Sequence, residues 1–191
     1  MNLVAIVLAA GAGTRFGGNK LSAQFRGEPL IAHAIRAARA APVARVIVVC
    51  PPGLDISEWP GMPEVETLRI TSSEMSATLK AGIAAAAGTD AAFVFLGDMP
   101  LVPQQLAGEL AAALAGNFAA VPCWQGRKGH PVLLSAAAFA EIARLSGDEG
   151  AGRLLKARKD VAFLDTTEEG VVLDIDRAED IARLEDRQGE A

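Results

Sequence analysis

A glycine-rich segment near the N-terminus carries the residues best suited to chemistry. Residues 8–20 read Leu-Ala-Ala-Gly-Ala-Gly-Thr-Arg-Phe-Gly-Gly-Asn-Lys. They begin at the last residue of an apolar run, Leu3–Leu8. Glycines let a backbone approach a ligand closely, and consecutive N–H groups in such a turn can point at one anion. Arg15 and Lys20 add positive charge to the same turn. The segment therefore predicts a binding site for a polyphosphate.

Two better-known phosphate-binding loops do not match this segment. A P-loop ends in Gly-Lys-Ser/Thr, whereas residues 18–21 read Gly-Asn-Lys-Leu. A dinucleotide-binding loop reads Gly-x-Gly-x-x-Gly, and Phe16 stands where the third glycine belongs. The next expected strand ends in Cys-Pro-Pro at residues 50–52, without the acid that would hold a ribose. We therefore do not expect NAD binding.

Three aspartates are candidate metal ligands. Asp98 follows an apolar run, and a carboxylate at the C-terminal end of a strand suits Mg²⁺, which takes protein oxygens together with phosphates and waters. Asp174 and Asp176 alternate along an expected strand, so both would point to the same face. Two alternatives stay open: Asp98 could only shape a turn, and Asp176 could cap the helix after it, since residues 176–179 have capping-box spacing.

Hydroxyl and basic side chains could extend this site. Residues 72–79 read Ser-Ser-Glu-Met-Ser-Ala-Thr-Leu and open a helix, where N–H groups and hydroxyls suit an anion or a base edge. These residues could equally serve as helix caps alone. Basic residues at 127, 128 and 130 could clamp a second, anionic substrate or form a plain basic turn. Met75 and Met99 are expected in the core.

Composition narrows the class of protein. The chain has 191 residues, 51% of them hydrophobic, and a net charge of −5, which argues against a broad nucleic-acid-binding surface. Cys50 and Cys123 lack metal-like spacing, and no secretory segment or apolar stretch of about 18 residues is present. We therefore expect buried free thiols in a cytoplasmic protein with no membrane span.

Apolar runs alternate with helical patterns along most of the chain. Strands are expected over residues 3–8, 46–50, 66–70, 92–96, 118–122, 161–164 and 171–175, and helices over 29–40, 76–87, 103–115, 136–145, 151–159 and 178–186. Residues 123–134 predict a loop or hairpin. This alternation is typical of an α/β fold with three αβα layers and a mostly parallel, Rossmann-like sheet.

No linker divides the sequence, so we expect one domain over residues 1–191, with a frayed tail at 187–191. Ligands of such sheets bind outside the carboxyl ends of the strands. The loops after Leu8, Cys50, Ile70, Leu96 and Ile175 should therefore surround one crevice.

The motifs together resemble the MobA-like NTP transferases, and among them the molybdenum cofactor cytidylyltransferase branch. The resemblance rests on segments 8–21, 28–33, 75–82, 96–102, 129–133, 147–151 and 174–176. Glu74 replaces a usual glycine, and Arg-Ala at 177–178 replaces the usual Thr-Pro. The resemblance implies the fold of the nucleotide-diphospho-sugar transferases.

The resemblance also implies a reaction, namely transfer of CMP from CTP to the terminal phosphate of a molybdopterin-type cofactor, with release of pyrophosphate. Ala-Ala at residues 9–10 points to CTP over GTP, and segment 129–132 to a pterin-type acceptor. The product would pass to a transient molybdoenzyme partner.

Each candidate residue has an expected role in this reaction. Mg²⁺ on Asp98, with Asp174 or Asp176, would bridge the phosphates, while Lys20 would stabilise the α-phosphoryl oxygens and Arg15 the leaving group. The expected nucleotide contacts are Leu8, Ala9, Ala10, Gly11, Ala12, Gly13, Lys20, Ser73, Ser76, Thr78 and Asp98, and the expected acceptor contacts are Arg127, Lys128 and His130.

Alternative functions stay open at this point. The enzyme could be a guanylyltransferase, or a nucleotidyltransferase acting on a sugar or polyol phosphate. A different class would be a carrier that binds a nucleotide or cofactor without chemistry.

Overall fold

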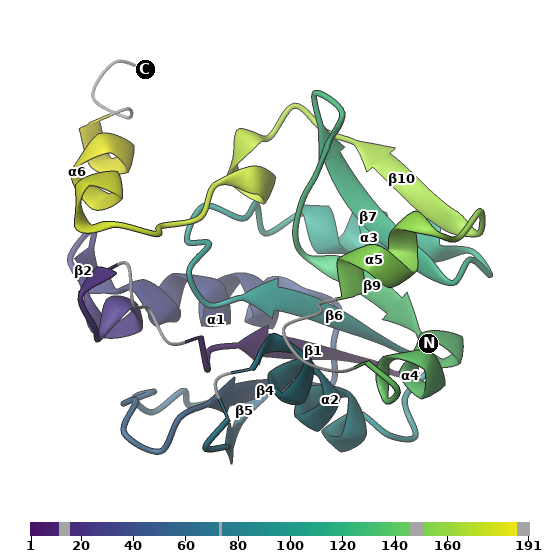
Figure 1. Cartoon of the computed structure of the whole chain (residues 1–191), viewed down its shortest axis with the longest axis horizontal. Helices are drawn as coiled ribbons and strands as arrows, with labels where there is room; N and C mark the ends of the chain where they lie inside the picture. The colour runs from purple at the N-terminus through teal and green to yellow at the C-terminus, as the bar shows by residue number, and fades with distance from the viewer. Residues whose placement is uncertain (12–15, 73, 146–150, 187–191) are drawn as a thin grey trace.

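An eight-stranded mixed sheet lies at the centre of the molecule, in a computed structural model that describes residues 1–11, 16–72, 74–145 and 151–186. Its strands are β1 (Leu3–Leu8), β4 (Arg45–Cys50), β5 (Glu64–Arg69), β6 (Ala91–Leu96), β7 (Ala119–Trp124), β8 (Arg127–Lys128), β9 (Val132–Ser135) and β10 (Val161–Asp165). Their order is β10-β7-β9-β6-β1-β4-β5, with β8 paired to β7 off this path (Figure 1). Strand β9 is antiparallel to β6 and β7, and β8 is antiparallel to β7. The other strands run in one direction and therefore end at one edge of the sheet.

The inner strands form from continuous apolar runs. In β1, β4 and β6, five residues of six are buried. Strands buried on both faces are typical of a parallel sheet covered by helices on both sides. Strand β5 has no fully buried residue, as expected for the edge of the sheet.

Helices cover both faces of the sheet. Helices α1 (Leu30–Ala40) and α3 (Leu106–Leu114) pack in one core cluster, and α2 (Met75–Ala85), α4 (Ala136–Ile142) and α5 (Ala151–Lys156) pack in a second on the opposite face (Figure 1). Gly82 lets α2 approach β1 closely, because an added Cβ would lie 2.6 Å from a methyl group of Ile6. The three-layer αβα prediction is confirmed.

A third, small cluster joins two distant parts of the chain. It contains the buried residues Phe25, Leu30, Ile175 and Leu184. Helix α6 (Ala178–Asp186) lies beside the hairpin of β2 (Gln24–Phe25) and β3 (Glu28–Pro29) at one end of the molecule (Figure 1). The Arg26 N–H donates to Glu185 Oε1 at 2.6 Å. This contact region fixes both the short helix η2 (Lys20–Ser22) and the segment before α6.

One predicted strand is wrong. Residues 171–175 form the end of a 3₁₀ helix, η3 (Glu169–Val172), followed by residues in no regular element. Their backbone bonds to loops: the His130 N–H donates to Val171 O at 2.8 Å, and the Ile175 N–H donates to Asp98 O at 3.0 Å. The segment therefore crosses the edge of the sheet where the parallel strands end. No described strand lies alongside it to form the hydrogen bonds of a β-ladder.

Most other elements lie where the sequence predicts them. Strand β1 and helix α6 have the predicted bounds, and segment 123–134 is a hairpin containing β8. The predicted helix at 103–115 begins later, at Leu106. The tail predicted at 187–191 lies outside the described residues. Within the described ranges, every helix is too short or too polar to cross a membrane.

Candidate active site

Lys20 and two aspartates from distant parts of the chain meet where the parallel strands end. The Lys20 ammonium donates to Asp98 Oδ2 at 2.7 Å and to Asp176 Oδ1 at 3.1 Å. Lys20 lies on η2, Asp98 is the second residue after β6, and Asp176 precedes α6. The fold therefore brings together residues separated by 78 and 156 positions in the sequence.

The three aspartates predicted as metal ligands lie together. One carboxylate oxygen from each of Asp98, Asp174 and Asp176 lies within 4.8 Å of the other two, and we call these residues the acid trio. The hydrogen bond from the Ile175 N–H to Asp98 O holds the two C-terminal members beside the first. Three carboxylates in this space could hold a divalent cation, for which oxygen ligands are preferred.

Gly97 permits the turn that presents Asp98. Its N–H donates to Leu8 O at 2.9 Å, so the ends of β6 and β1 lie in contact. A Cβ at Gly97 would lie 2.9 Å from Ile31 Cδ1, which would have to shift, and 3.2 Å from Leu8 O, which is a tight contact. A larger residue would therefore crowd this crossing of strand, helix and turn.

The acid trio and its neighbours shift each other's ionisation. Burial disfavours the ammonium form of Lys20, but hydrogen bonds and charge from Asp98 and Asp176 outweigh it and raise its pKa. Partial burial of its carboxyl group, with negative charge from the other two aspartates, raises the pKa of Asp174. Burial of the imidazole lowers the pKa of His130, despite the hydrogen bond with Val94 O and charge from the aspartates. Lys20 is thus held charged and His130 neutral.

A cleft of about 660 Å³ opens beside Lys20 and Asp98. Its volume is in the range of small-molecule and cofactor sites. It is bounded by the loops after β1, β4 and β5 and by the first turns of α2. Its lining residues are Leu8, Ala9, Ala10, Gly11, Asn19, Lys20, Leu21, Ser22, Pro51, Gly53, Leu54, Thr71, Ser72, Met75, Thr78, Leu96 and Asp98.

Most of the described residues predicted to bind nucleotide line this cleft. They are Leu8, Ala9, Ala10, Gly11, Lys20, Thr78 and Asp98. Ser76 does not line it: this residue is 1% exposed, and its Oγ has no hydrogen-bond partner among the residues that the structure describes. Ala12, Gly13, Arg15 and Ser73 lie outside the described residues.

Sequence reasoning missed several cleft residues. Met75 was expected in the core, but it is 51% exposed and lines the cleft, because it is the first residue of α2. Met99, expected in the core too, is buried. Pro51 and Leu54 also line the cleft, from the loop after β4. The rule that ligands meet loops at strand ends pointed to this loop but not to its residues.

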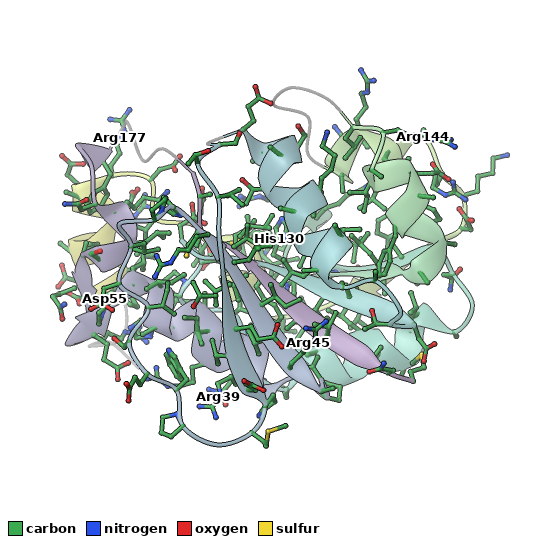
Figure 2. The ribbon with its side chains drawn as sticks, turned by 90° about the horizontal axis from the view of Figure 1, so that it is seen from below. Arg39, Arg45, Asp55, His130, Arg144 and Arg177 are labelled. Atoms are coloured by element: carbon green, nitrogen blue, oxygen red, sulfur yellow. The ribbon has the colours of Figure 1, made fainter. Side chains whose placement is uncertain are left out.

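Two of the three predicted acceptor contacts, Arg127 and Lys128, point apart. Arg127 lies over the ring of Trp124 at 5.9 Å, and Lys128 lies over the ring of Phe163 at 4.6 Å. Neighbouring residues of a strand point to opposite faces, so β8 directs these two cations apart. His130 Nδ1 lies 3.3 Å from Val94 O near the middle of the molecule (Figure 2).

The cap of α6 differs in part from the predicted capping box. Asp180 Oδ2 accepts hydrogen bonds from the Asp176 and Arg177 N–H groups, at 3.0 and 2.8 Å. The carboxylate that reaches back is therefore that of Asp180 and not that of Glu179. Asp176 Oδ1 accepts a hydrogen bond from Lys20, so its side chain takes part in the candidate site.

Three named proteins are similar in sequence. The chain is 28% identical to the purine catabolism protein PucB of Bacillus subtilis, over 93% of each chain. It is 33% identical to a 2-C-methyl-D-erythritol 4-phosphate cytidylyltransferase of Cereibacter sphaeroides, covering 69% of this chain and 65% of that protein. It is 30% identical to a probable molybdenum cofactor guanylyltransferase of Thermococcus gammatolerans, over 73% of each.

Solved structures share the fold. The crystal structure of a homologue of Mycobacterium tuberculosis Rv0371c, from a Mycobacterium strain, superposes with a TM-score of 0.85 at 25% identity, over 98% of this chain and 97% of that one. A manganese complex of Rv0371c itself gives a TM-score of 0.74 at 22% identity, covering 96% of this chain and 98% of that one.

A family model decides the assignment, since it spans most of the sequence. The model of the MobA-like NTP transferase domain matches residues 5–161, which include Lys20 and Asp98. The chain therefore belongs to the family of MobA-like NTP transferases and is a nucleotidyltransferase.

Proposed function

We propose that the protein transfers CMP from CTP to the terminal phosphate of a molybdopterin-type cofactor and releases pyrophosphate. One observation carries this proposal: Lys20 Nζ lies 2.7 Å from Asp98 Oδ2 at the wall of a nucleotide-sized cleft. A cation beside carboxylates that could hold a metal ion suits a reaction in which charge develops on phosphate oxygens.

The chain's own residues would act by positioning and by neutralising charge. A phosphate monoester has a second pKa of about 6, so the acceptor is largely dianionic near pH 7 and needs no general base to attack the α-phosphorus in line. Lys20 would stabilise the α-phosphoryl oxygens, and Arg15 the leaving pyrophosphate. The other proposed nucleotide contacts are residues 8–13, Ser73, Thr78 and Asp98, whereas Ser76 is dropped because it is buried away from the cleft.

Mg²⁺ is the proposed cofactor, and the acid trio fits it. Asp98, with Asp174 or Asp176, would hold the ion through the hard oxygen ligands that Mg²⁺ prefers. When bound, it would supply positive charge that neutralises the phosphates. The manganese complex of the mycobacterial protein is a precedent for a divalent ion on this fold.

The proposed acceptor side is the hairpin that carries Arg127, Lys128 and His130. Strands β7 and β8 contact helix η3, Trp124 and Val172 pack against the same core cluster, and Val172, at the end of η3, stands two residues before Asp174. Arg127, over the Trp124 ring, therefore lies on the side that adjoins the segment of the acid trio. We favour Arg127 and His130 over Lys128 as the contacts with an acceptor phosphate.

Named relatives support two alternatives within the same reaction class. The relative from Thermococcus gammatolerans is named for guanylyl transfer to the molybdenum cofactor, and that from Cereibacter sphaeroides for cytidylyl transfer to a polyol phosphate. The name of the Thermococcus relative includes the proposed acceptor, the molybdenum cofactor, and the name of the Cereibacter relative includes the proposed base, cytosine. A carrier without chemistry is the third alternative.

We extend the proposal to the setting of the enzyme. One domain over residues 1–191, a cytoplasmic location and transient transfer of the product to a molybdoenzyme complete it. Co-purification of the protein with a molybdoenzyme, dependent on loaded cofactor, would support the partner.

Pyrophosphate release tests the proposed reaction. The protein would be incubated with Mg²⁺ and either CTP or GTP, together with molybdopterin, with 2-C-methyl-D-erythritol 4-phosphate or with no acceptor. We expect release that requires both CTP and molybdopterin and that is lost in Asp98→Asn. Release only with GTP, or only with the polyol phosphate, would replace the proposal with the corresponding alternative, and nucleotide binding without release would favour a carrier.

A further inference from the structure

Lys20 is the cation closest to the acid trio among the interactions of the described residues. Its ammonium contacts Asp98 at 2.7 Å and Asp176 at 3.1 Å, so it engages two of the three carboxylates. The Lys20 side chain is 11% exposed, against 25% and 43% for the two aspartate side chains. The ammonium is therefore the inner partner, and the carboxylates lie between it and solvent.

This geometry makes Lys20 a competitor for the oxygens that a divalent ion would use. Mg²⁺ binds oxygen at about 2.0–2.1 Å and demands near-octahedral geometry. An ammonium already bound to Asp98 Oδ2 and Asp176 Oδ1 takes a lone pair from each and places a like charge beside the ion. Oxygens of the trio lie within 4.8 Å of one another, which leaves little room for both cations.

The adjoining cleft offers Lys20 another partner. Lys20 and Asp98 both line it, and the glycine-rich segment enters it through Gly11. A polyphosphate placed there would present several oxygens to the ammonium. A lysine carries its charge on a flexible four-carbon stem, so the ammonium can change partners without movement of the backbone.

We propose that Lys20 serves as an internal counter-ion that blocks the acid trio until a nucleotide polyphosphate draws it away. The divalent ion and the nucleotide then bind with positive coupling, and metal alone binds weakly. The inference rests on the proposed function for the position of the polyphosphate. Coupling of this kind is reciprocal, because each ligand raises the affinity for the other by the same factor.

Binding of Mn²⁺ without nucleotide tests the blocking role directly. Free Mn²⁺ would be measured by electron paramagnetic resonance for the wild type, Lys20→Met, Lys20→Arg and Asp98→Asn. We expect Lys20→Met to bind Mn²⁺ at least about tenfold more tightly than the wild type, within the 5–150-fold range typical of coupled sites. Lys20→Arg should bind as weakly as the wild type, because it keeps the charge, and Asp98→Asn should lose binding.

A matched control and a second readout guard against trivial effects. Lys159→Met removes an exposed lysine before β10, so it should leave Mn²⁺ affinity unchanged. Thermal unfolding with and without Mn²⁺ should give a larger stabilisation for Lys20→Met than for the wild type. Mn²⁺ binding by folded Lys20→Met that is equal to or weaker than that of the wild type would overturn the inference.

Adding a non-hydrolysable CTP analogue tests the release of Lys20. In the wild type we expect the analogue to tighten Mn²⁺ binding by at least about tenfold, with a much smaller gain in Lys20→Met. An equal gain in both proteins would overturn the exchange of partners. Failure of the wild type to bind CTP at all would instead overturn the proposed function, and the metal comparison without nucleotide would still stand.

Discussion

The two sides of the candidate site are built in different ways. The nucleotide side consists of the cleft, Lys20 and Asp98, and its side chains come from the segments that connect parallel strands to the helices after them and from the first turns of α2. The acceptor side consists of the hairpin of β7, β8 and β9, which runs antiparallel. Parallel strands bring their ends to one edge, so the side chains of the nucleotide side converge by topology.

The acceptor side depends on the pairing register of its strands, which sends Arg127 and Lys128 to different aromatic rings. Because side chains converge on the first side and diverge on the second, we expect the site to select its nucleotide more strictly than its acceptor.

Replacement of Asp98 by asparagine should have the largest effect. The change keeps the shape of the side chain and removes the charge that contacts Lys20. We expect turnover to fall by about 10²–10³-fold, the usual cost of losing one such charge contact. Steady-state pyrophosphate release measures this, with circular dichroism to establish folding. A folded variant with near-normal turnover would contradict the proposed role of Asp98 on the nucleotide side.

Separate replacement of Arg127 and Lys128 by alanine should test the divergence of the hairpin. We expect Arg127→Ala to raise the KM for the acceptor by about tenfold, the value of a hydrogen bond to a charged group. Lys128→Ala should change it by less than about twofold, because Lys128 faces Phe163. Equal effects would mean that both cations reach one acceptor and that the divergence disappears on binding.

Replacement of Met75 by alanine should weaken nucleotide binding without unfolding the protein. Met75 is 51% exposed and lines the cleft, so it can cover the base. We expect a roughly fivefold rise in the Kd for CTP, from loss of about 1 kcal/mol of apolar contact. Met62→Ala is the matched control, since Met62 is 76% exposed and lies outside the cleft lining. Calorimetric titration with the same Kd for all three proteins would contradict this role.

Replacement of His130 by asparagine should give the smallest effect, on the pH dependence of stability. Burial lowers the pKa of His130 in the folded protein, so below about pH 6.5 the unfolded chain binds a proton that the folded protein does not. The contribution of His130 to the free energy of unfolding is therefore present above about pH 6.5 and is lost as the pH falls. The loss is at most about 1.4 kcal/mol per pH unit. Urea unfolding between pH 7 and 5 should give a shallower decline for the variant. Identical slopes would mean that the imidazole of the hairpin is open to protonation.

The sequence predicted the nucleotide side better than the acceptor side, for physical reasons. Apolar runs locate strand ends, and topology then brings Lys20, Asp98 and the loop after β4 to one edge. The direction of Arg127 and Lys128 could not be predicted, because it depends on a two-residue strand whose register local sequence does not determine. Asp174 and Asp176 were expected on a strand that does not exist, yet the fold brings them together through a hydrogen bond at Ile175. Met75 was missed because a methionine at a helix start looks like a core residue until the neighbouring loops are in place.

Thermal unfolding with CTP, GTP, ATP and UTP, each with and without Mg²⁺, tests most directly that the cleft and the acid trio form one nucleotide site. A ligand at about 100 times its Kd adds roughly 2.7 kcal/mol of stability, or about 5–10 °C for a domain of this size. We predict a shift of this size for CTP that requires Mg²⁺ and that is lost in Asp98→Asn. No shift with any nucleotide, or an equal CTP shift in Asp98→Asn, would contradict the account.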